Sequence, residues 1–398
     1  MILSTFASQN ESKQNMKMTK YKLGELVEVT RGASLSGQFY AEEGKLIRLT
    51  LGNFNMNGGG FKENTSKTDL YFTGTVRDEF ILNKGDIITP LTEQSLGLLG
   101  TTARIPESGK YIQSQDVALV RCKEGRLDPN FCYYLISSSI VRQQLSAAAQ
   151  QTKIRHTSPE KIKDCTVWVP DFEIQKNIGR ILTDIDNKIA INRQINDNLE
   201  AMAKQLYDYW FVQFDFPNEE GKPYKSSGGA MVWNDKLKRE IPQGWSDCKL
   251  KDFINLFDSK RVPLSSKDRG ERQGVYPYYG ATGIMDYVND YIFDGDYILL
   301  AEDGSTSDAK GFPIVQYIWG KNWVNNHAHI ILPKNERYMM FTYQMLRSIP
   351  AKQIETGSIQ KKISQENLCG YKMVLPNSDL LEKYENVVFP LWESTYFL

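Results

Sequence analysis

The chain carries nearly the same sequence twice, and this repeat limits its fold more than any other feature. Tyr21–Val29 (YKLGELVEV) returns as Cys248–Leu256 (CKLKDFINL), and Ile81–Thr89 (ILNKGDIIT) returns as Tyr291–Leu300 (YIFDGDYILL). A third stretch, QQTKIRHTSPEKIKDCTVWVP, returns as SIQKKISQENLCGYKMVLP. The period of roughly 210–225 residues is far longer than a solenoid or propeller repeat, so it indicates a duplicated domain. Two similar surfaces at a fixed distance would suit a two-part linear ligand, and DNA is the first candidate.

The composition is that of a water-soluble protein with more than one core. The chain has 398 residues, of which 41% are hydrophobic and 24% charged, enough for two or three cores. Its mean hydropathy is -0.45, and no apolar run approaches the ~18–20 residues of a membrane span. Residues 1–20 are expected to form a polar tail and not a signal peptide. The 5 cysteines make no CxxC pair, which disfavours disulfides and zinc and favours a cytoplasmic protein.

The charge pattern excludes one class of DNA-binding protein. Because the formal net charge is +0, a general polyanion binder is not expected, since such proteins carry a basic excess. A protein that recognises a specific DNA sequence needs positive charge only on the surface that contacts the DNA. Residues 152–163 (TKIRHTSPEKIK) and 259–272 (SKRVPLSSKDRGER) provide it, although such stretches are also typical of solvated loops.

Two modules with short strands and Gly, Asn or Ser turns are expected, at residues 21–170 and 243–376. Helices are predicted at Asn130–Ala149, after an Asp-Pro stop, and near Tyr338–Gln353. Each module therefore belongs to the α+β class.

A long helix is predicted between the modules, at residues 171–216. Its apolar residues recur at steps of three and four, which is the seam of a coiled coil, with a polar slot at Asn192. About 40 residues at 1.5 Å each give a rod of roughly 60 Å. A helix packed on its own domain is the alternative; the narrow stripe and the length favour a coiled-coil arm. The seam residues are Ile174, Ile178, Ile181, Ile185, Ile189, Ile195, Leu199, Met202 and Leu206.

Two further segments complete the chain. Residues 217–242 begin with the Pro-, Gly- and Ser-rich run FPNEEGKPYKSSGG and are predicted to be a linker. Residues 377–398 keep helical spacing, and Pro390 should kink this second helix. This second helix is about half as long as the first.

No catalytic signature is present. The sequence has no GxxxxGK[ST] loop, no GxGxxG and no Pro-Pro pair. His327 and His329 lie in a predicted strand, where alternate side chains share one face and could hold a metal. Only two ligands are visible, so packed or hydrogen-bonding histidines are the favoured interpretation. The chain itself is therefore predicted to have no enzymatic activity and no cofactor.

The ordered motifs resemble the specificity (S) subunit of type I restriction–modification systems. They are KLGELVEVTRG, KGDIIT, TKIRHTSPEKIKDCTVWVP, the helix EIQKNIGRILTDIDNKIAINRQINDNLEAMAKQLYDYWF, FPNEEGKPYKSSGGAMVWNDKLKREIPQGW, YPYYGATGIMDYV, DGDYILLAEDG and TGSIQKKIS. The resemblance covers about residues 19–398.

This resemblance implies a fold and a set of partners. It implies two α+β target recognition domains in pseudo-twofold duplication, joined by long conserved helices that pack antiparallel as a ruler. Each domain would read one half of a bipartite sequence in double-stranded DNA. The helices would dock two modification (methyltransferase) subunits, which bind S-adenosylmethionine, and restriction subunits would join this core. A full-length member would have two helices of similar length, so the resemblance implies that the stretch from Ile195 to Tyr209 lacks its antiparallel partner here. That exposed seam is expected to bind the modification subunits or a second copy of the chain.

The resemblance also implies candidate DNA-contacting residues, in loops that recur in the family and match between the two modules. Affinity should come from Lys and Arg on phosphates, and polar side chains should read base edges. For each single residue an ordinary turn role is an equal alternative. The candidates are Arg31, Ser34, Gln94, Ser95, Gln151, Lys153 and Arg155 in the first module, and Tyr279, Thr282, Ser305, Thr306, Lys310, Ser358, Gln360, Lys361 and Lys362 in the second.

Two other functions stay open at this point. A pure assembly protein would use the rod as a scaffold and its modules to bind protein, and the neutral net charge is the best argument for it. A nuclease or methylase hidden in a module is the third option. Paired basic and polar loops at equivalent places in both modules favour DNA recognition over scaffolding.

Overall fold

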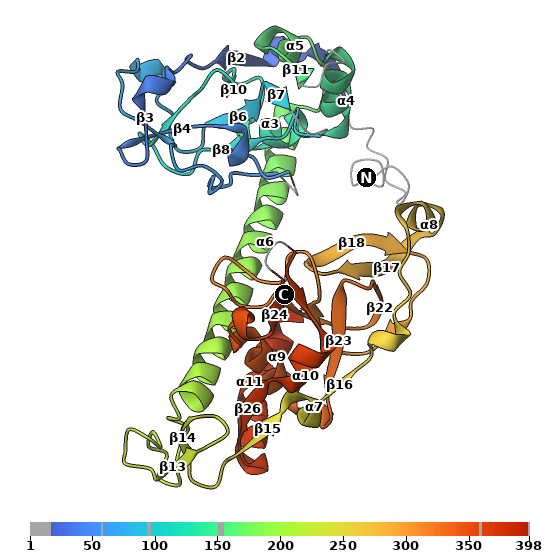
Figure 1. Ribbon diagram of the computed structural model, residues 1–398. Coiled ribbons are helices and arrows are strands. Elements are labelled where there is room, and N and C mark those ends of the chain that lie inside the picture. Colours follow the sequence, from blue (N-terminus) through green and yellow to red (C-terminus); the bar gives the residue numbers. More distant parts are fainter. Residues whose placement is uncertain (1–16, 57–58, 94–96, 150–154, 358–359, 397–398) are drawn as a thin grey trace. The chain divides into compact units, whose positions relative to one another are not determined.

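The computed structural model describes residues 17–56, 59–93, 97–149, 155–357 and 360–396 (Figure 1). The chain divides into two compact units, residues 1–190 and 191–398, and the boundary falls inside one long helix. Each unit contains one copy of the repeat. Within the described ranges, no helix combines the length and the apolar character that a membrane crossing requires.

The first unit is built mainly from short strands. A four-stranded sheet has the order β2-β10-β6-β8, and a second has the order β3-β5-β4-β9. The first and last strands of the module, β1 and β12, pair antiparallel and so bring its two ends together. Its elements are β1 (Thr19–Lys22), α2 (Leu23–Leu26), β2 (Val27–Arg31), β3 (Tyr40–Ala41), β4 (Leu46–Arg48), β5 (Tyr71–Phe72), β6 (Ile87–Pro90), β7 (Thr92–Glu93), β8 (Ala103–Arg104), β9 (Tyr111–Ile112), β10 (Val117–Cys122), α3 (Pro129–Ile136), α4 (Ser139–Ala148), β11 (Arg155–His156), α5 (Pro159–Lys163) and β12 (Thr166–Val169).

The second unit repeats this plan. Its sheets have the orders β16-β23-β20-β21 and β18-β17-β22-β19. Its elements after the long helix are β13 (Met231–Asn234), β14 (Arg239–Pro242), β15 (Ser246–Lys249), α7 (Leu250–Phe253), β16 (Ile254–Leu256), α8 (Ser266–Glu271), β17 (Gln273–Gly280), β18 (Gly283–Val288), β19 (Phe293–Asp294), β20 (Tyr297–Ala301), β21 (Val315–Ile318), β22 (Lys321–Val324), β23 (Ala328–Pro333), α9 (Met339–Ser348), β24 (Glu355–Thr356), β25 (Lys362–Ile363), α10 (Gln365–Gly370), β26 (Lys372–Leu375) and α11 (Ser378–Tyr396).

The duplication extends to single hydrogen bonds. In the second unit β15 pairs antiparallel with β26, as β1 pairs with β12 in the first. The one-turn helix after each opening strand buries its first residue, Leu23 in α2 and Leu250 in α7. Each of these residues donates its N–H, at 2.8 Å, to a carbonyl that precedes the closing strand, that of Cys165 or of Tyr371. The predicted α+β class and the repeated module are therefore confirmed.

Both helices predicted inside the modules end earlier than expected. The first stops at Ile136 and restarts at Ser139 as α4. Between them, the hydroxyls of Ser137 and Ser138 bond to carbonyls of the preceding turn, and such bonds compete with helix continuation. In the second module α9 ends at Ser348, just before Pro350, because a proline disfavours the helical conformation of the residue before it.

The predicted linker is only partly irregular. It contains the hairpin of β13 and β14, and Ile241 in this hairpin is buried. Phe216 stacks on Trp245 and on Tyr224, with ring centroids 5.1 and 4.6 Å apart. The aromatic residues fix the segment to its unit, which turn composition alone could not indicate.

The long helix is present as α6 (Phe172–Tyr207), followed by one π-helical turn, η4 (Asp208–Val212). At its start Ile178 packs against the core of the first unit. Near its end Ala203, Tyr207, Trp210 and Phe211 are buried in the core of the second unit. Between them, a stripe of predicted seam residues has exposed fractions between 37% and 53% (Ile181, Ile185, Ile189, Ile195 and Met202).

The expectation that the far half of α6 lacks a partner is wrong for its last turns. Helix α11 continues through Pro390 and contacts this part of α6 within the second unit. The Tyr384 ring lies 4.9 Å from that of Phe211, and its hydroxyl donates to the carbonyl of Ala203 at 3.4 Å. The residues buried in these last turns lie beside the predicted seam positions and not at them. The exposed stripe of seam residues therefore lies mainly nearer the middle of α6.

A buried carboxylate caps α9. The Glu385 side chain on α11 is 7% exposed, and its two oxygens accept the N–H groups of Met340 and Phe341 at 3.2 and 2.8 Å. Burial raises the pKa of Glu385 to about 7, although these two hydrogen bonds act in the opposite direction. The stability of the unit should therefore depend on pH near neutrality.

We expect Glu385 to make the second unit less stable above pH 7. Its folded-state pKa lies above the unfolded value of about 4.3, so the folded state holds a proton that the unfolded state has lost, and the free energy of unfolding falls by about 3 kcal/mol as pH rises from 5 to 8. Urea unfolding at several pH values, followed by tryptophan fluorescence, measures this slope. Glu385→Gln should flatten it, whereas Glu382→Gln, at an exposed site on the same helix, should not. An unchanged slope in the Glu385 variant would assign the effect to another group.

Candidate nucleic-acid interface

In the first module, a buried carboxylate holds the loop that precedes α5. Strand β7 pairs antiparallel with β11, which places Glu93 opposite Arg155. Nη1 of Arg155 lies 3.1 Å from Oε1 of Glu93, and the carboxylate is only 3% exposed. Its Oε2 accepts the N–H groups of Gly97, Leu98 and Leu99 at 2.9–3.1 Å. One glutamate thus connects two of the loops that were expected to face DNA.

The second module joins the corresponding loops in the same way. The residue after β20, Glu302, has its carboxylate Oε1 3.2 Å from Nζ of Lys362, at the start of β25. The next residue, Asp303, forms a backbone bridge to Lys362. Nζ of Lys361 lies 3.0 Å from Oε2 of Glu355 on β24. Both lysines are about half-exposed, whereas both glutamates are largely buried.

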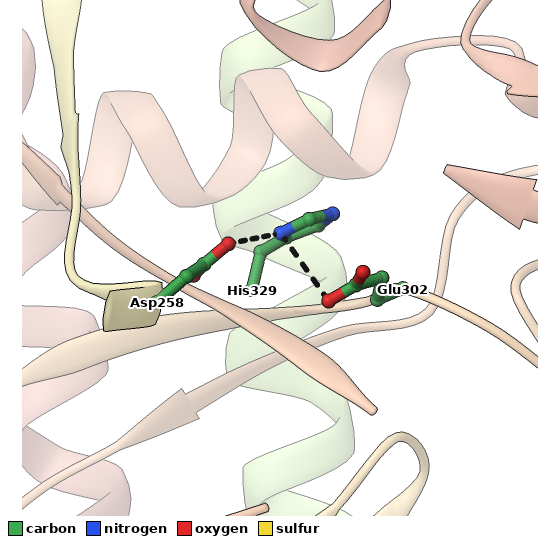
Figure 2. Close-up of side chains that lie close together, drawn as sticks. All are labelled: Asp258, Glu302 and His329. Carbon is green, nitrogen blue, oxygen red and sulfur yellow. Dashed lines mark hydrogen bonds and ion pairs between the residues drawn. The ribbon is translucent and has the colours of Figure 1, made fainter. Parts of the chain in front are cut away.

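Behind this junction, Asp258, Glu302 and His329 form a buried ionic cluster, shown in Figure 2. Asp258 begins η5 (Asp258–Lys260), and His329 lies on β23. Nδ1 of His329 is 2.6 Å from Asp258 Oδ2 and 3.8 Å from Glu302 Oε2. Its Nε2 is 2.8 Å from the carbonyl oxygen of Ile363 on β25. Both ring nitrogens therefore face oxygen atoms, and the ring bridges Asp258 and the main chain of β25.

Asp258 stays ionised in this cluster although it is buried. Burial acts to raise the pKa of its carboxyl, but the hydrogen bond and the charge of His329 outweigh this effect, and the net pKa is lowered. Oδ1 accepts the N–H of Ile330 at 2.9 Å, and Oδ2 accepts the amide of Gln365 at 2.6 Å. Gln365 is the first residue of α10, so the carboxylate also connects to the helix that follows the loop.

Glu302 is held between cations. Nη1 of Arg261 lies 2.7 Å from Glu302 Oε2, and Lys362 pairs with the other oxygen. Burial acts to raise the pKa of Glu302, and the hydrogen bond from Arg261 together with the His329 charge lowers it overall. Carboxylates and a histidine can also bind a divalent metal, and here their ligand atoms lie within 4.8 Å of one another. The Arg261 guanidinium and the His329 ring already bond to these oxygens, so the geometry favours a hydrogen-bonded ionic network over a metal site.

The two histidines do not form a pair. His327 precedes β23 and is partly exposed, with Nδ1 2.6 Å from Oδ1 of Asp303, whereas His329 is fully buried. They therefore bond to different carboxylates, which agrees with the hydrogen-bonding interpretation and gives no shared metal ligand set.

The structure leaves most of the described candidate residues at the surface. Exposed side chains are those of Arg31, Ser34, Thr282, Ser305, Lys310, Gln360, Lys361 and Lys362, and those of Arg155 and Tyr279 are half-buried. Thr306 is a correction: it is 1% exposed, and its hydroxyl donates to Glu355 at 2.7 Å, so it holds a loop and does not face a ligand. Gln94, Ser95, Gln151, Lys153 and Ser358 lie outside the described residues.

Sequence reasoning missed the acidic members of the network. Asp258 and Glu302 were not singled out, and Glu355 was not noticed beside the TGSIQKK motif. The run LLAEDG gave one usable signal, because two acidic residues directly follow a strand of mostly buried residues, Tyr297–Ala301. Arg261 bonds to Glu302 from 41 residues away and Gln365 bonds to Asp258 from 107 residues away, which no local pattern can reveal.

The chain matches one protein family over most of its length. The family model for the type I restriction modification DNA specificity domain matches residues 15–201 and 242–380. The chain is 33% identical over 127 residues to a Haemophilus influenzae protein named as a type I restriction enzyme specificity subunit, covering 32% of each chain. It is 22% identical over 284 residues to the MjaIX specificity subunit of Methanocaldococcus jannaschii, covering 66% of this chain and 62% of that one.

These matches span less than two thirds of either relative. The fold itself is like that of the S subunit of a type I restriction-modification system from M. genitalium, with a TM-score of 0.58 at 16% identity over 97% of this chain and 92% of that one. Because the family match includes both copies of the repeat, this chain belongs to the family of type I restriction–modification specificity subunits.

Proposed function

We propose that this chain recognises a bipartite target in double-stranded DNA, with each module reading one half, for a type I restriction–modification complex. The chain supplies specificity and no chemistry. Methyl transfer from S-adenosylmethionine, ATP hydrolysis and DNA cleavage belong to the modification and restriction subunits. The modules differ in detailed sequence, so they read different half-sites. Such a complex acts in the cytoplasm, where the DNA lies.

One observation carries this proposal. In both modules, the same two loops meet at the end of the strand that follows the Gly-Asp turn, and in the second module the exposed Ser305, Lys310, Lys361 and Lys362 lie on these loops. Phosphate contacts position a protein on DNA, and polar side chains on loops read base edges. A scaffold has no need for two such loop pairs in equivalent places.

Methylation mapping tests the proposal. The chain is expressed with its cognate modification subunit in a host without DNA methylation, and the genome is sequenced for N6-methyladenine. We expect one motif of two short halves around a fixed gap, and exchanging one module should change one half only. An assembled complex that neither methylates a motif nor binds DNA would contradict the proposal.

The exposed isoleucines of α6 support docking of the modification subunits. A stripe of large apolar side chains on one helix is costly to leave in water and marks an interaction surface. The same stripe is also the observation that favours the second candidate function, a scaffold that binds protein only. The two functions share this surface and differ in whether the loops bind DNA.

We expect the double substitution Ile185→Ser and Ile189→Ser to weaken binding of the modification subunit at least tenfold without unfolding the chain, because both side chains are exposed. Co-purification and titration calorimetry measure the effect. Asp184→Ser with Lys188→Ser, at exposed positions of the same helix, is the matched control. Size-exclusion chromatography of the chain alone shows whether a second copy uses the stripe instead. Undiminished binding by the isoleucine variant would place the docking surface elsewhere.

A further inference from the structure

Three basic residues in the described parts of the matching loops are already paired inside the protein. Arg155 pairs with Glu93, Lys361 with Glu355, and Lys362 with Glu302, at 3.0–3.2 Å. The three carboxylates are only 3%, 7% and 13% exposed. The pairing therefore occurs in both modules and always joins a surface cation to a buried anion.

The burial of the anion decides what such a cation can do. To bind a DNA phosphate, the cation would have to give up a close bond to a carboxylate that has little access to water, and water cannot replace that bond fully at a largely buried group. Two of the carboxylates make further interactions: Glu93 accepts hydrogen bonds from three backbone N–H groups, and Glu302 also pairs with Arg261. They cannot move into solvent without releasing these groups.

The main chain reinforces each pair. In the first module the N–H of Thr157 donates to the carbonyl of Leu91, and in the second the N–H of Ile363 donates to the carbonyl of Glu302, both at 2.8 Å. The His329 ring adds a bond to the carbonyl of Ile363. The described residues directly before α5 and α10 are thus held by charge pairs, one in the first module and two in the second, and by backbone hydrogen bonds beside them.

We propose that Arg155, Lys361 and Lys362 are positioning residues for DNA recognition and do not bind phosphates. They hold residues 155–158 before α5 and residues 360–364 before α10 in position, each module for recognition of its own half-site. The inference rests on the proposed DNA recognition. Phosphate binding in the second module falls to cations such as Lys310, which is exposed on the neighbouring loop.

The substitution Lys362→Gln distinguishes a positioning role of this lysine from phosphate binding. Once methylation mapping gives the motif, the affinity of the complex is measured between 50 and 200 mM salt, for the matching duplex and for duplexes altered in either half. A phosphate contact contributes about one unit to the slope of log affinity against log salt. We expect Lys362→Gln to leave this slope unchanged and to reduce discrimination at one half-site at least tenfold, with Lys362→Arg restoring it. Lys310→Gln should lower the slope by about one.

The substitution Glu302→Gln also distinguishes phosphate binding from positioning, because the two roles of Lys362 predict opposite effects on DNA binding. If Lys362 bound a phosphate, removal of its carboxylate partner would free the lysine and tighten DNA binding. As a positioning pair, Glu302→Gln should instead lose discrimination at the same half-site as Lys362→Gln, and Arg155→Gln should affect the other half. A reduced salt slope with intact discrimination in Lys362→Gln, or no change in either quantity, would overturn the inference. Absence of any motif for the wild-type complex would count against the proposed function and not against this pairing.

Discussion

Tyr384→Ala is expected to lower the free energy of unfolding of the second unit by about 3–5 kcal/mol, the range found when a large aromatic side chain is removed from a core. Tyr384 is fully buried, and its ring contacts Trp210 and Phe211 at centroid distances of 5.7 and 4.9 Å. It is the residue through which α11 meets the end of α6. Its loss leaves a cavity that neither helix can fill, because both are fixed by other core contacts.

Urea unfolding followed by tryptophan fluorescence measures this effect in the second unit, because Trp168 is the only tryptophan before residue 191. Tyr384→Phe is the matched control. It keeps the ring and removes only the hydroxyl that donates to Ala203 at 3.4 Å, so a loss below about 1 kcal/mol is expected. Equal losses in the two variants would show that the hydroxyl, and not the packing of the ring, connects the helices.

His329→Leu should destabilise the same unit by a similar amount, about 3–5 kcal/mol, because it removes a basic side chain that lies against both buried carboxylates, those of Asp258 and Glu302, and leaves Arg261 to pair with both. The His329 ring contacts Asp258 and the Ile363 carbonyl at 2.6 and 2.8 Å. Leucine fills most of the volume of histidine, so the expected loss is electrostatic and not a cavity effect. We also expect the variant to lose discrimination at the half-site of the second module, since the ring helps to hold β25.

His327→Leu is the control for this prediction. Its partner Asp303 lies nearer to water, and exposed pairs contribute about 0–1 kcal/mol. Acid unfolding gives a second measurement. The folded-state pKa values of Asp258 and Glu302 are lowered, so the stability that they contribute is present above their unfolded values of about 4 and is lost as pH falls through the folded values. This loss at acid pH should shrink in His329→Leu. Equal effects of the two histidine variants would contradict the network.

The sequence predicted the large-scale fold because its signals are local or repeated. The pairs Tyr21–Val29 with Cys248–Leu256 indicated the duplication, and the recurrence of isoleucine indicated α6. It did not predict where the helices break. The stop before Ser139 depends on hydroxyl bonds within a run of serines, and the helical seam did not show which turns of α6 would be buried by α11.

For the candidate site, the sequence located the loops but not the partners of their residues. The sequence identified Lys361 and Lys362 as candidates because they are basic residues in a loop, and the structure places both in the segment that leads into α10. What changes their expected role is a buried glutamate on another segment, since Glu302 is 60 residues from Lys362 in the numbering of the chain. Thr306 illustrates the same limit, because its burial against Glu355 is a property of the packed loops alone.

The sequence by itself determined that this chain has two copies of one α+β module and a long apolar-striped helix, because duplication and helical periodicity are properties of order along the chain. Only the tertiary structure decided which charges face solvent and which are neutralised internally. The physical reason is that the strength of an ion pair depends on burial and on distance in space. Asp258, Glu302 and His329 come from three separate segments, and only the fold brings them within 4.8 Å.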